Sequence, residues 1–129
     1  MDITPLIRAN QQVIQSYANG VFKISSVVYN SPVIVAPDET IIWEIPNVES
    51  VSDLKLEHFN NLINDCDDID VVLLGSGAKM AFLPRDLKIS LKESGLNIDV
   101  MDTGAACRTY NVLMAEGRRV VCALLPFKE

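Results

Sequence analysis

This sequence has few of the side chains that serve as nucleophiles, bases and metal ligands. It contains one histidine, His58, and three cysteines, which are scattered and form no Cys-x-x-Cys pair. Three scattered cysteines indicate neither a disulfide framework nor a zinc site, and they fit a reducing compartment. No cysteine or serine has a recognisable histidine partner, so the sequence does not predict acyl transfer.

Long apolar runs and basic clusters are also missing. No window approaches the roughly 20 apolar residues of a membrane-spanning helix. The opening residues, MDITPLIRANQQ, show neither a secretory signal nor an Arg-rich transit pattern. The formal net charge is −6 with no basic patch, which argues against nucleic acid or an anionic membrane as the main partner. We therefore expect a cytoplasmic, bacterial-type protein without membrane insertion.

What the chain does contain is the composition of a folded domain. Hydrophobic residues make up 49% of its 129 residues and charged residues 22%, which suffices for a core without disulfides or metals. We expect a single domain over residues 1–129. Residues 1–46 form a β meander in this prediction, and residues 47–129 alternate between helix and strand.

Turn signals divide the first third into short strands. Asn19-Gly20 separates two apolar-rich runs, 11–18 and 21–29, and such a pair is the strongest short hairpin signal. Further turns at 30–32 and 37–39 predict strands at 33–36 and 40–45.

Helical and strand-like patterns alternate in the remainder. Helices are expected at 52–63, with Leu56, Phe59, Leu62 and Ile63 facing the core, at 85–94, and from the cap residues Asp102 and Thr103 to just before Gly117. Buried strands are expected at 70–74, 97–101 and 118–126. Strands separated by helices of this length predict parallel pairing and an α/β fold.

A glycine loop follows the strand at 70–74. Gly75-Ser76-Gly77 stands where phosphate-binding loops occur in open α/β sheets. The dinucleotide pattern needs a glycine where this chain has Met80, and the Walker pattern fails because Lys79 is not followed by Ser or Thr. The glycines therefore serve either a sharp turn or one wall of a cleft.

Cys107 lies near a helix start, where backbone dipoles lower the pKa of a thiol. It has no base partner in the sequence, since His58 belongs to a different predicted helix. We interpret Cys107 as a small core residue.

An acidic run precedes the strand at 70–74. Asp65, Asp67, Asp68 and Asp70 resemble the beginning of a calcium loop, but Asp70 and Ser76 occupy the positions that require glycine and glutamate. We interpret this run as a solvated turn.

The segment MDTGAACRTYNVLMAEGRRVVCALLP, residues 101–126, is too particular for a generic helix and strand. With the early hairpin and VVLLGSGAKMAFLP, it resembles the signature of a small, largely uncharacterised family that includes mitochondrial complex I assembly factor three and the adipogenesis-associated domain-containing proteins. The resemblance covers nearly the whole chain. The positions that match the family motif are Gly75, Gly77, Thr103, Ala106, Arg108, Thr109, Asn111, Glu116 and Arg118.

The resemblance implies a three-layer α/β domain with a mixed, mainly parallel central sheet plus an N-terminal antiparallel β-hairpin portion. It assigns no catalytic activity. Mitochondrial members carry an N-terminal targeting extension that this chain does not show, which favours a bacterial cytoplasm.

We expect a non-enzymatic, assembly-factor-like domain that binds another protein, without cofactor, metal or nucleic acid, and a homo-oligomer stays open. The alternative is a small-molecule or anion-binding protein, with catalysis left open. Its cleft would lie between the Gly75–Gly77 loop and the Thr103–Arg108 helix start, with Arg108 pairing the anion. The residues assigned to this cleft are Gly75, Ser76, Gly77, Thr103, Gly104, Cys107, Arg108 and Asn111.

Overall fold

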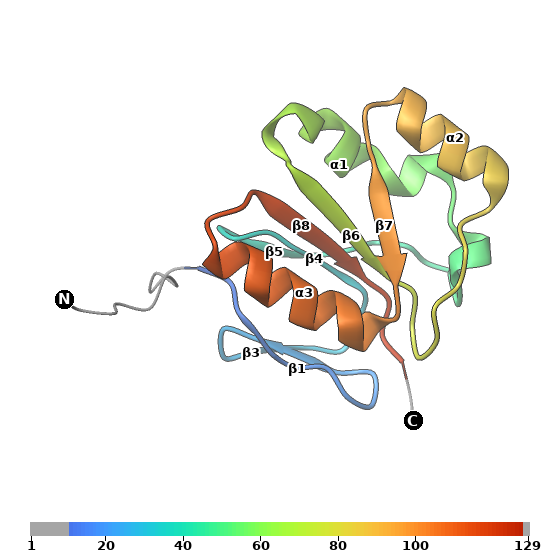
Figure 1. Cartoon of the computed structure of the whole chain (residues 1–129). Helices are drawn as coiled ribbons and strands as arrows, with labels where there is room; N and C mark the ends of the chain where they lie inside the picture. Colours follow the sequence, from blue (N-terminus) through green and yellow to red (C-terminus); the bar gives the residue numbers. More distant parts are fainter. Residues whose placement is uncertain (1–10, 128–129) are drawn as a thin grey trace.

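Two β-sheets form the framework of the structure, a computed structural model that describes residues 11–127 (Figure 1). A five-stranded mixed sheet has the order β5-β4-β8-β6-β7, and a three-stranded antiparallel sheet has the order β1-β2-β3. The strands are β1 (Ile14–Ser16), β2 (Phe22–Ile24), β3 (Val27–Tyr29), β4 (Val33–Val35), β5 (Thr40–Ile42), β6 (Val71–Gly75), β7 (Ile98–Met101) and β8 (Val120–Leu124). Residues 1–10, where we expect no targeting segment, lie outside the described residues.

Helices and single 3-10 turns connect these strands. The helices are α1 (Asn60–Asn64), α2 (Arg85–Glu93) and α3 (Thr103–Ala115), and the 3-10 turns are η1 (Val51–Asp53), η2 (Leu56–Phe59) and η3 (Cys66–Asp68). Gly95 and Gly117, at φ 95° and 82°, follow the ends of α2 and α3, as glycine does after a helix.

Most strands of the central sheet run in one direction. β6 is parallel to both β7 and β8. β4 runs antiparallel to both β5 and β8, so β4 is the reversed strand of this sheet. The prediction of a mixed, mainly parallel central sheet is confirmed.

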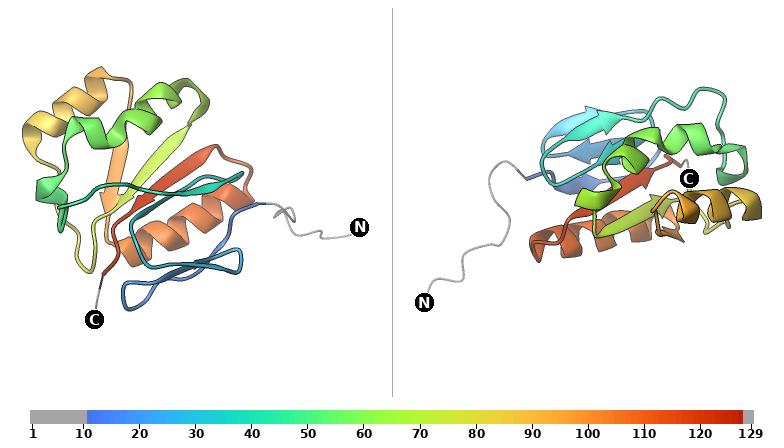
Figure 2. Two further views of the ribbon diagram at one scale, coloured as in Figure 1. Left: turned by 180° about the vertical axis from the view of Figure 1, so that it is seen from behind. Right: turned by 90° about the horizontal axis from the view of Figure 1, so that it is seen from above.

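The central sheet is buried on both faces. On β8, Val121 and Ala123 pack with residues of α1 and α2, whereas Val120, Cys122 and Leu124 pack with α3 and the three-stranded sheet. This alternation is the period of two that a strand imposes, and it places β8 at the centre of three layers (Figures 1 and 2). The predicted three-layer α/β fold is confirmed.

The first third is divided between the two sheets. β1, β2 and β3 form the small sheet, which is the expected N-terminal antiparallel portion. β4 and β5 instead form a hairpin at the edge of the central sheet. The meander thus supplies strands to two layers of the molecule.

The run 21–29, expected as one arm of the hairpin around Asn19-Gly20, is not a single strand, because the chain reverses in its middle. Ser25 and Ser26 have φ of 45° and 73°, and β2 and β3 pair on either side of them. Two positive φ values are typical of a type I′ turn, in which serine is not a favoured residue. The Ser25 hydroxyl compensates by donating to the carbonyl of Gln11 and accepting from the N–H of Val13.

The single helix expected at 52–63 is also wrong. Leu54 and Lys55 have extended backbone, with ψ of 143° and 162°, and separate η1 from η2. The side chain of His58 holds this break, because its Nδ1 accepts from the N–H of Lys55 at 2.9 Å. A local side-chain hydrogen bond of this kind competes with helix formation.

The break changes which apolar side chains reach the core. Phe59 and Leu62 are buried as expected, but Leu56 is 39% exposed. The rings of Trp43 and Phe59 pack edge to face, with ring centroids 5.6 Å apart, and Trp43 Nε1 donates to the carbonyl of His58. Tertiary packing therefore overrides the helical period of this segment.

Candidate functional site

A buried threonine ties the loop after β6 to the start of α3. The hydroxyl of Thr103 donates to the carbonyl of Leu125 at 2.6 Å and accepts from the N–H of Gly77 at 2.8 Å. The N–H of Thr103 donates to the carbonyl of Gly77 at 2.9 Å. The carboxyl ends of β6 and β8 are thereby fixed to α3.

Gly75 and Gly77 meet different requirements of this loop. A Cβ at Gly75 would lie 2.9 Å from both Thr103 Oγ1 and Leu124 Cδ2, which is closer than packed atoms approach. Gly77 instead has φ 107°, a conformation that residues with a side chain rarely adopt. Between them, the Ser76 hydroxyl donates to a carbonyl of the same loop at 2.7 Å. The motif thus forms a tight connection.

The start of α3 has its own partners. Asp102 caps the helix, because its Oδ1 accepts from the N–H of Ala105 at 2.9 Å. Arg108 donates from Nη1 to the hydroxyl of Tyr17 at 2.7 Å. A Cβ on Gly104 would lie 3.1 Å from the Tyr17 ring and 3.2 Å from Arg108 Nη1. The carboxylate of Asp102 occupies the place where a helix start attracts an anion.

Further along α3, two side chains hold β1. The Asn111 amide accepts from the N–H of Ile14 at 3.0 Å and donates to the carbonyl of Ile14 at 2.8 Å. The hydroxyl of Tyr110 donates to the carbonyl of Gln12 at 2.8 Å. Polar side chains of α3 thereby satisfy backbone groups of β1, an edge strand of the small sheet, and of the residue Gln12 just before it.

Cys107 packs in the core beside α3 with 1% of its surface exposed. Burial raises the pKa of its thiol from 9.0 to about 12, although Arg108 acts in the opposite direction. A nucleophilic cysteine requires the reverse, a lowered pKa and access to solvent. Among residues 11–127, no group of three or more His, Cys, Asp or Glu side chains is arranged to hold a metal ion.

The structure distributes the predicted cleft residues over several contacts. They lie at the junction of the glycine loop with α3 (Gly75, Ser76, Gly77 and Thr103), against Tyr17 (Gly104 and Arg108), on β1 (Asn111) and in the core (Cys107). Each of these contacts has a structural role. A ligand-binding cleft at this place stays a prediction.

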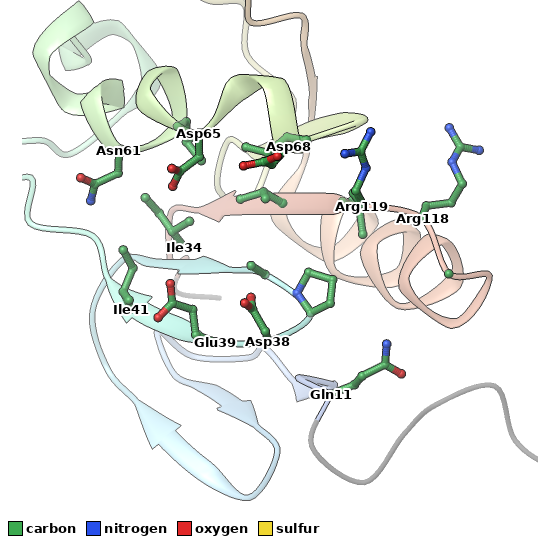
Figure 3. A pocket seen from close by; sticks show the side chains of 17 residues that line it. Gln11, Ile34, Asp38, Glu39, Ile41, Asn61, Asp65, Asp68, Arg118 and Arg119 are labelled. Carbon is green, nitrogen blue, oxygen red and sulfur yellow. The ribbon is translucent and has the colours of Figure 1, made fainter.

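A different groove, of about 520 Å³, lies at the opposite end of β8 (Figure 3). Its apolar lining comes from the central sheet and from the helical segment above it, through Ile34, Ile41, Leu62, Ile69 and Val121. The β4–β5 turn forms one side of the groove, closed by the hydrogen bond from the Ala36 N–H to the Glu39 carbonyl at 2.8 Å.

Charged side chains surround this apolar lining. Figure 3 shows Asp65 and Asp68 on one side and Asp38 and Glu39 on the other. All four are exposed. In sequence, both segments are typical of turns, and nothing local indicates that they face each other across β8. The signal that could have found the groove is the pair of acidic turns flanking apolar strands.

Two arginines line one end of the groove. Arg119 binds Asp70 in a two-point contact, with Nη2 to Oδ1 at 2.7 Å and Nε to Oδ2 at 3.2 Å. The hydrogen bond from Arg119 holds the pKa of Asp70 below its usual value. Arg118 lines the same end and is exposed. Among residues 11–127, none of the helices has the length and apolar character needed to cross a bilayer.

Known proteins resemble this chain in sequence. An uncharacterised protein of Rhodobacter capsulatus is 32% identical over 113 residues, which cover 88% of this chain and 83% of that protein. A Danio rerio protein named NADH dehydrogenase (ubiquinone) 1 alpha subcomplex assembly factor 3 is 34% identical over 114 residues. That similarity covers 88% of this chain but 64% of the longer Danio rerio protein.

The fold also has a match among solved structures. A crystal structure of a protein described as an outer membrane protein from Bartonella henselae superposes with a TM-score of 0.79 and 29% identity. The superposition covers 92% of this chain and 98% of the other. Residues 14–125, from β1 to just past β8, match the family described as "Protein of unknown function (DUF498/DUF598)". These similarities confirm the predicted resemblance, and the chain belongs to the DUF498/DUF598 family.

Proposed function

We propose that this protein is a non-enzymatic, assembly-factor-like domain that acts by binding another protein. The observation that carries the proposal is the similarity to the Danio rerio assembly factor, which extends over 88% of this chain. That span includes the loop after β6 and α3, so the shared part is the folded domain. Binding a protein partner needs a surface, and the structure offers one beside β7.

The loop between β6 and α2 presents large apolar side chains to solvent. Phe82 is 82% exposed and Met80 is 48% exposed. Together with Leu83, Ile98 and Val100 they line a shallow pocket of about 340 Å³. Exposed apolar groups that gather around a hollow favour an interaction surface, since water solvates them poorly.

The same surface borders an edge of the central sheet. β7 pairs with β6 on one side, and no other described strand pairs with its second side. The backbone N–H and C=O groups of such an edge can pair with a strand of a partner. Phe82 and Met80 would then provide the apolar contacts beside that strand.

Affinity purification from the native host, read by quantitative mass spectrometry, tests this proposal. The variant Phe82→Ser should lose a partner that the unaltered protein recovers, and its melting temperature should not change because the side chain is exposed. The matched control is Val112→Ser, which removes an exposed apolar side chain of α3. Recovery of the bait alone, or equal loss of the partner in both variants, would contradict the proposal.

The cytoplasmic location is part of this proposal. The Bartonella henselae relative is described as an outer membrane protein, so location needs a direct test. Cell fractionation should place the protein with the soluble cytoplasmic marker, and its recovery with the outer membrane would overturn this part.

The alternative, anion binding at the start of α3, is favoured by one observation. Arg108 is exposed, and its Nη1 lies beside the helix start at Gly104. Titration with inorganic phosphate should then give binding that Arg108→Ala weakens. Absence of phosphate binding to the unaltered chain would remove this alternative.

A further inference from the structure

The groove over β8 combines an apolar surface with exposed negative charge. The side chains of Asp38, Glu39, Asp65 and Asp68 form no ion pair within residues 11–127, although Asp68 also acts electrostatically on Arg119. Figure 3 shows these carboxylates on both sides of the apolar lining, with the arginines confined to one end. Exposed carboxylates on both sides give the groove a negative potential, which attracts a cation.

We infer that this groove binds a segment of a partner protein in which lysine or arginine side chains alternate with apolar ones. Apolar side chains of the segment would contact Ile34, Ile41 and Val121, while its cations would lie between the facing carboxylates. This inference goes beyond the proposed function, because it concerns a groove that shares no lining residue with the pocket around Phe82 and assigns that groove a ligand chemistry. It holds whether or not Phe82 contacts a partner.

The dimensions of the groove favour a peptide segment over a small cation. A volume of about 520 Å³ holds a few side chains, and the charged groups at its rim are exposed rather than enclosed. Pockets for small molecules instead bury most of the ligand surface. The described carboxylates also provide no metal-binding group, and an acidic groove repels nucleic acid.

The arginines define a direction along the groove. Asp70 pairs with Arg119 through their two-point contact, whereas Arg118 is exposed at that end and forms no ion pair within residues 11–127. A bound segment is therefore expected to place its basic side chains toward Asp38 and Asp65 and an acidic or carbonyl group toward Arg118.

Titration of the full chain with defined peptides tests the inference. The probe is a short fluorescent peptide of alternating leucine and lysine, and the comparison peptides carry serine or glutamate in place of lysine. Fluorescence anisotropy should show binding of the lysine peptide, roughly tenfold weaker binding of the serine peptide and none of the glutamate peptide. Added salt should weaken the binding of the lysine peptide more than that of the serine peptide, since salt screens exposed charges.

Charge-matched variants locate the site. Asp65→Asn with Asp68→Asn should weaken binding of the lysine peptide roughly five- to tenfold. The control, Asp86→Asn with Glu93→Gln, removes the same charge from exposed positions of α2 and should leave the affinity within about twofold. NMR chemical-shift changes should concentrate in residues 34–41, 61–69 and 118–121.

Each contrary outcome overturns the inference. Equally weakened binding of the lysine peptide in the groove variant and in the α2 control would mean that the peptide is attracted nonspecifically to a negatively charged protein. Shift changes outside the groove would mean another site. Equal binding of free arginine amide would identify a small-cation site, and a dimer that dissociates in the Asp65→Asn, Asp68→Asn variant would identify a second copy of this chain as the occupant.

Discussion

The hydroxyl of Thr103 donates a 2.6 Å hydrogen bond to the carbonyl of Leu125. Because the same hydroxyl accepts from the N–H of Gly77, Thr103→Val would leave both backbone groups unpaired in a buried place. Each unpaired buried group costs about 1 to 3 kcal/mol. We expect the free energy of unfolding to fall by about 2 to 4 kcal/mol, measured by urea denaturation.

The control for this prediction is Thr109→Val, which makes the same chemical change at a partly exposed position of α3. It should shift the free energy of unfolding by less than about 0.5 kcal/mol. Equal effects of the two substitutions would show that the hydroxyl of Thr103 contributes nothing particular.

The glycines predict a graded response to alanine. Gly75→Ala places a Cβ against Thr103 and Leu124, and overpacking of this kind costs about 1 to 3 kcal/mol. Gly117→Ala meets no neighbouring atom within 4 Å and has only its φ of 82° to oppose it, a cost of about 1 kcal/mol. Thermal and urea denaturation should rank Gly75→Ala as the more destabilising change. The reverse order would contradict the close approach at Gly75.

Asn111 is expected to control the exchange of β1 amide hydrogens. Asn111→Ala removes both hydrogen bonds to Ile14, at a cost of about 1 to 3 kcal/mol. Hydrogen exchange followed by NMR should show faster exchange at Ile14, with β6 and β8 unaffected below global unfolding. The adjacent control, Val112→Ala, truncates an exposed side chain. It should change the exchange rate neither at Ile14 nor in β6 and β8.

The cysteines predict both a labelling pattern and a pH response. Cys66 is partly exposed, whereas Cys107 and Cys122 are buried. At a pH of about 8, a thiol reagent should modify Cys66 in the folded chain and the other two only after unfolding. Mass spectrometry of the labelled protein measures this pattern, and rapid labelling of Cys107 would contradict its burial.

The pH response follows from the same burial. The pKa of Cys107 rises from 9.0 unfolded to about 12 folded, so the thiol form stabilises the fold fully below pH 9.0. This contribution declines as the pH rises from 9.0 toward 12, because the unfolded chain loses the proton first. The free energy of unfolding of Cys107→Ala, measured by urea denaturation, should therefore decline less steeply over this pH range than that of the unaltered protein. Equal declines in the two proteins would contradict the raised pKa of Cys107.

Strands and helices with regular apolar patterns could be predicted from the sequence. β8 is an uninterrupted apolar run, and the Ala106, Tyr110 and Met114 stripe of α3 is buried as its spacing requires. The Ser25-Ser26 turn could not be predicted, since its positive φ values occur at residues that rarely adopt them. The break in the helix expected at 52–63 depends on the hydrogen bond between Lys55 and His58. The spacing of apolar residues carries no information about such a bond.

The two candidate sites also differ in how far the sequence indicates them. The glycine loop and α3 are distinctive in the sequence because their residues are unusual, but in the fold these residues have structural partners, such as Tyr17 for Arg108 and Ile14 for Asn111. The acidic groove consists of ordinary turn residues that become notable only when the fold sets Asp38 opposite Asp65. Juxtaposition across a sheet is a property of topology, which no local pattern contains.

The position of β8 also constrains how the protein is made. β8 lies between β4 and β6, yet it follows every other strand along the chain. During synthesis, β4 and β6 therefore leave the ribosome long before the strand that joins them. Their unpaired edges and apolar faces stay exposed until residue 124 emerges, so the central sheet closes in one late step. Chains that stop before β8 should accumulate as aggregates rather than as smaller folded domains.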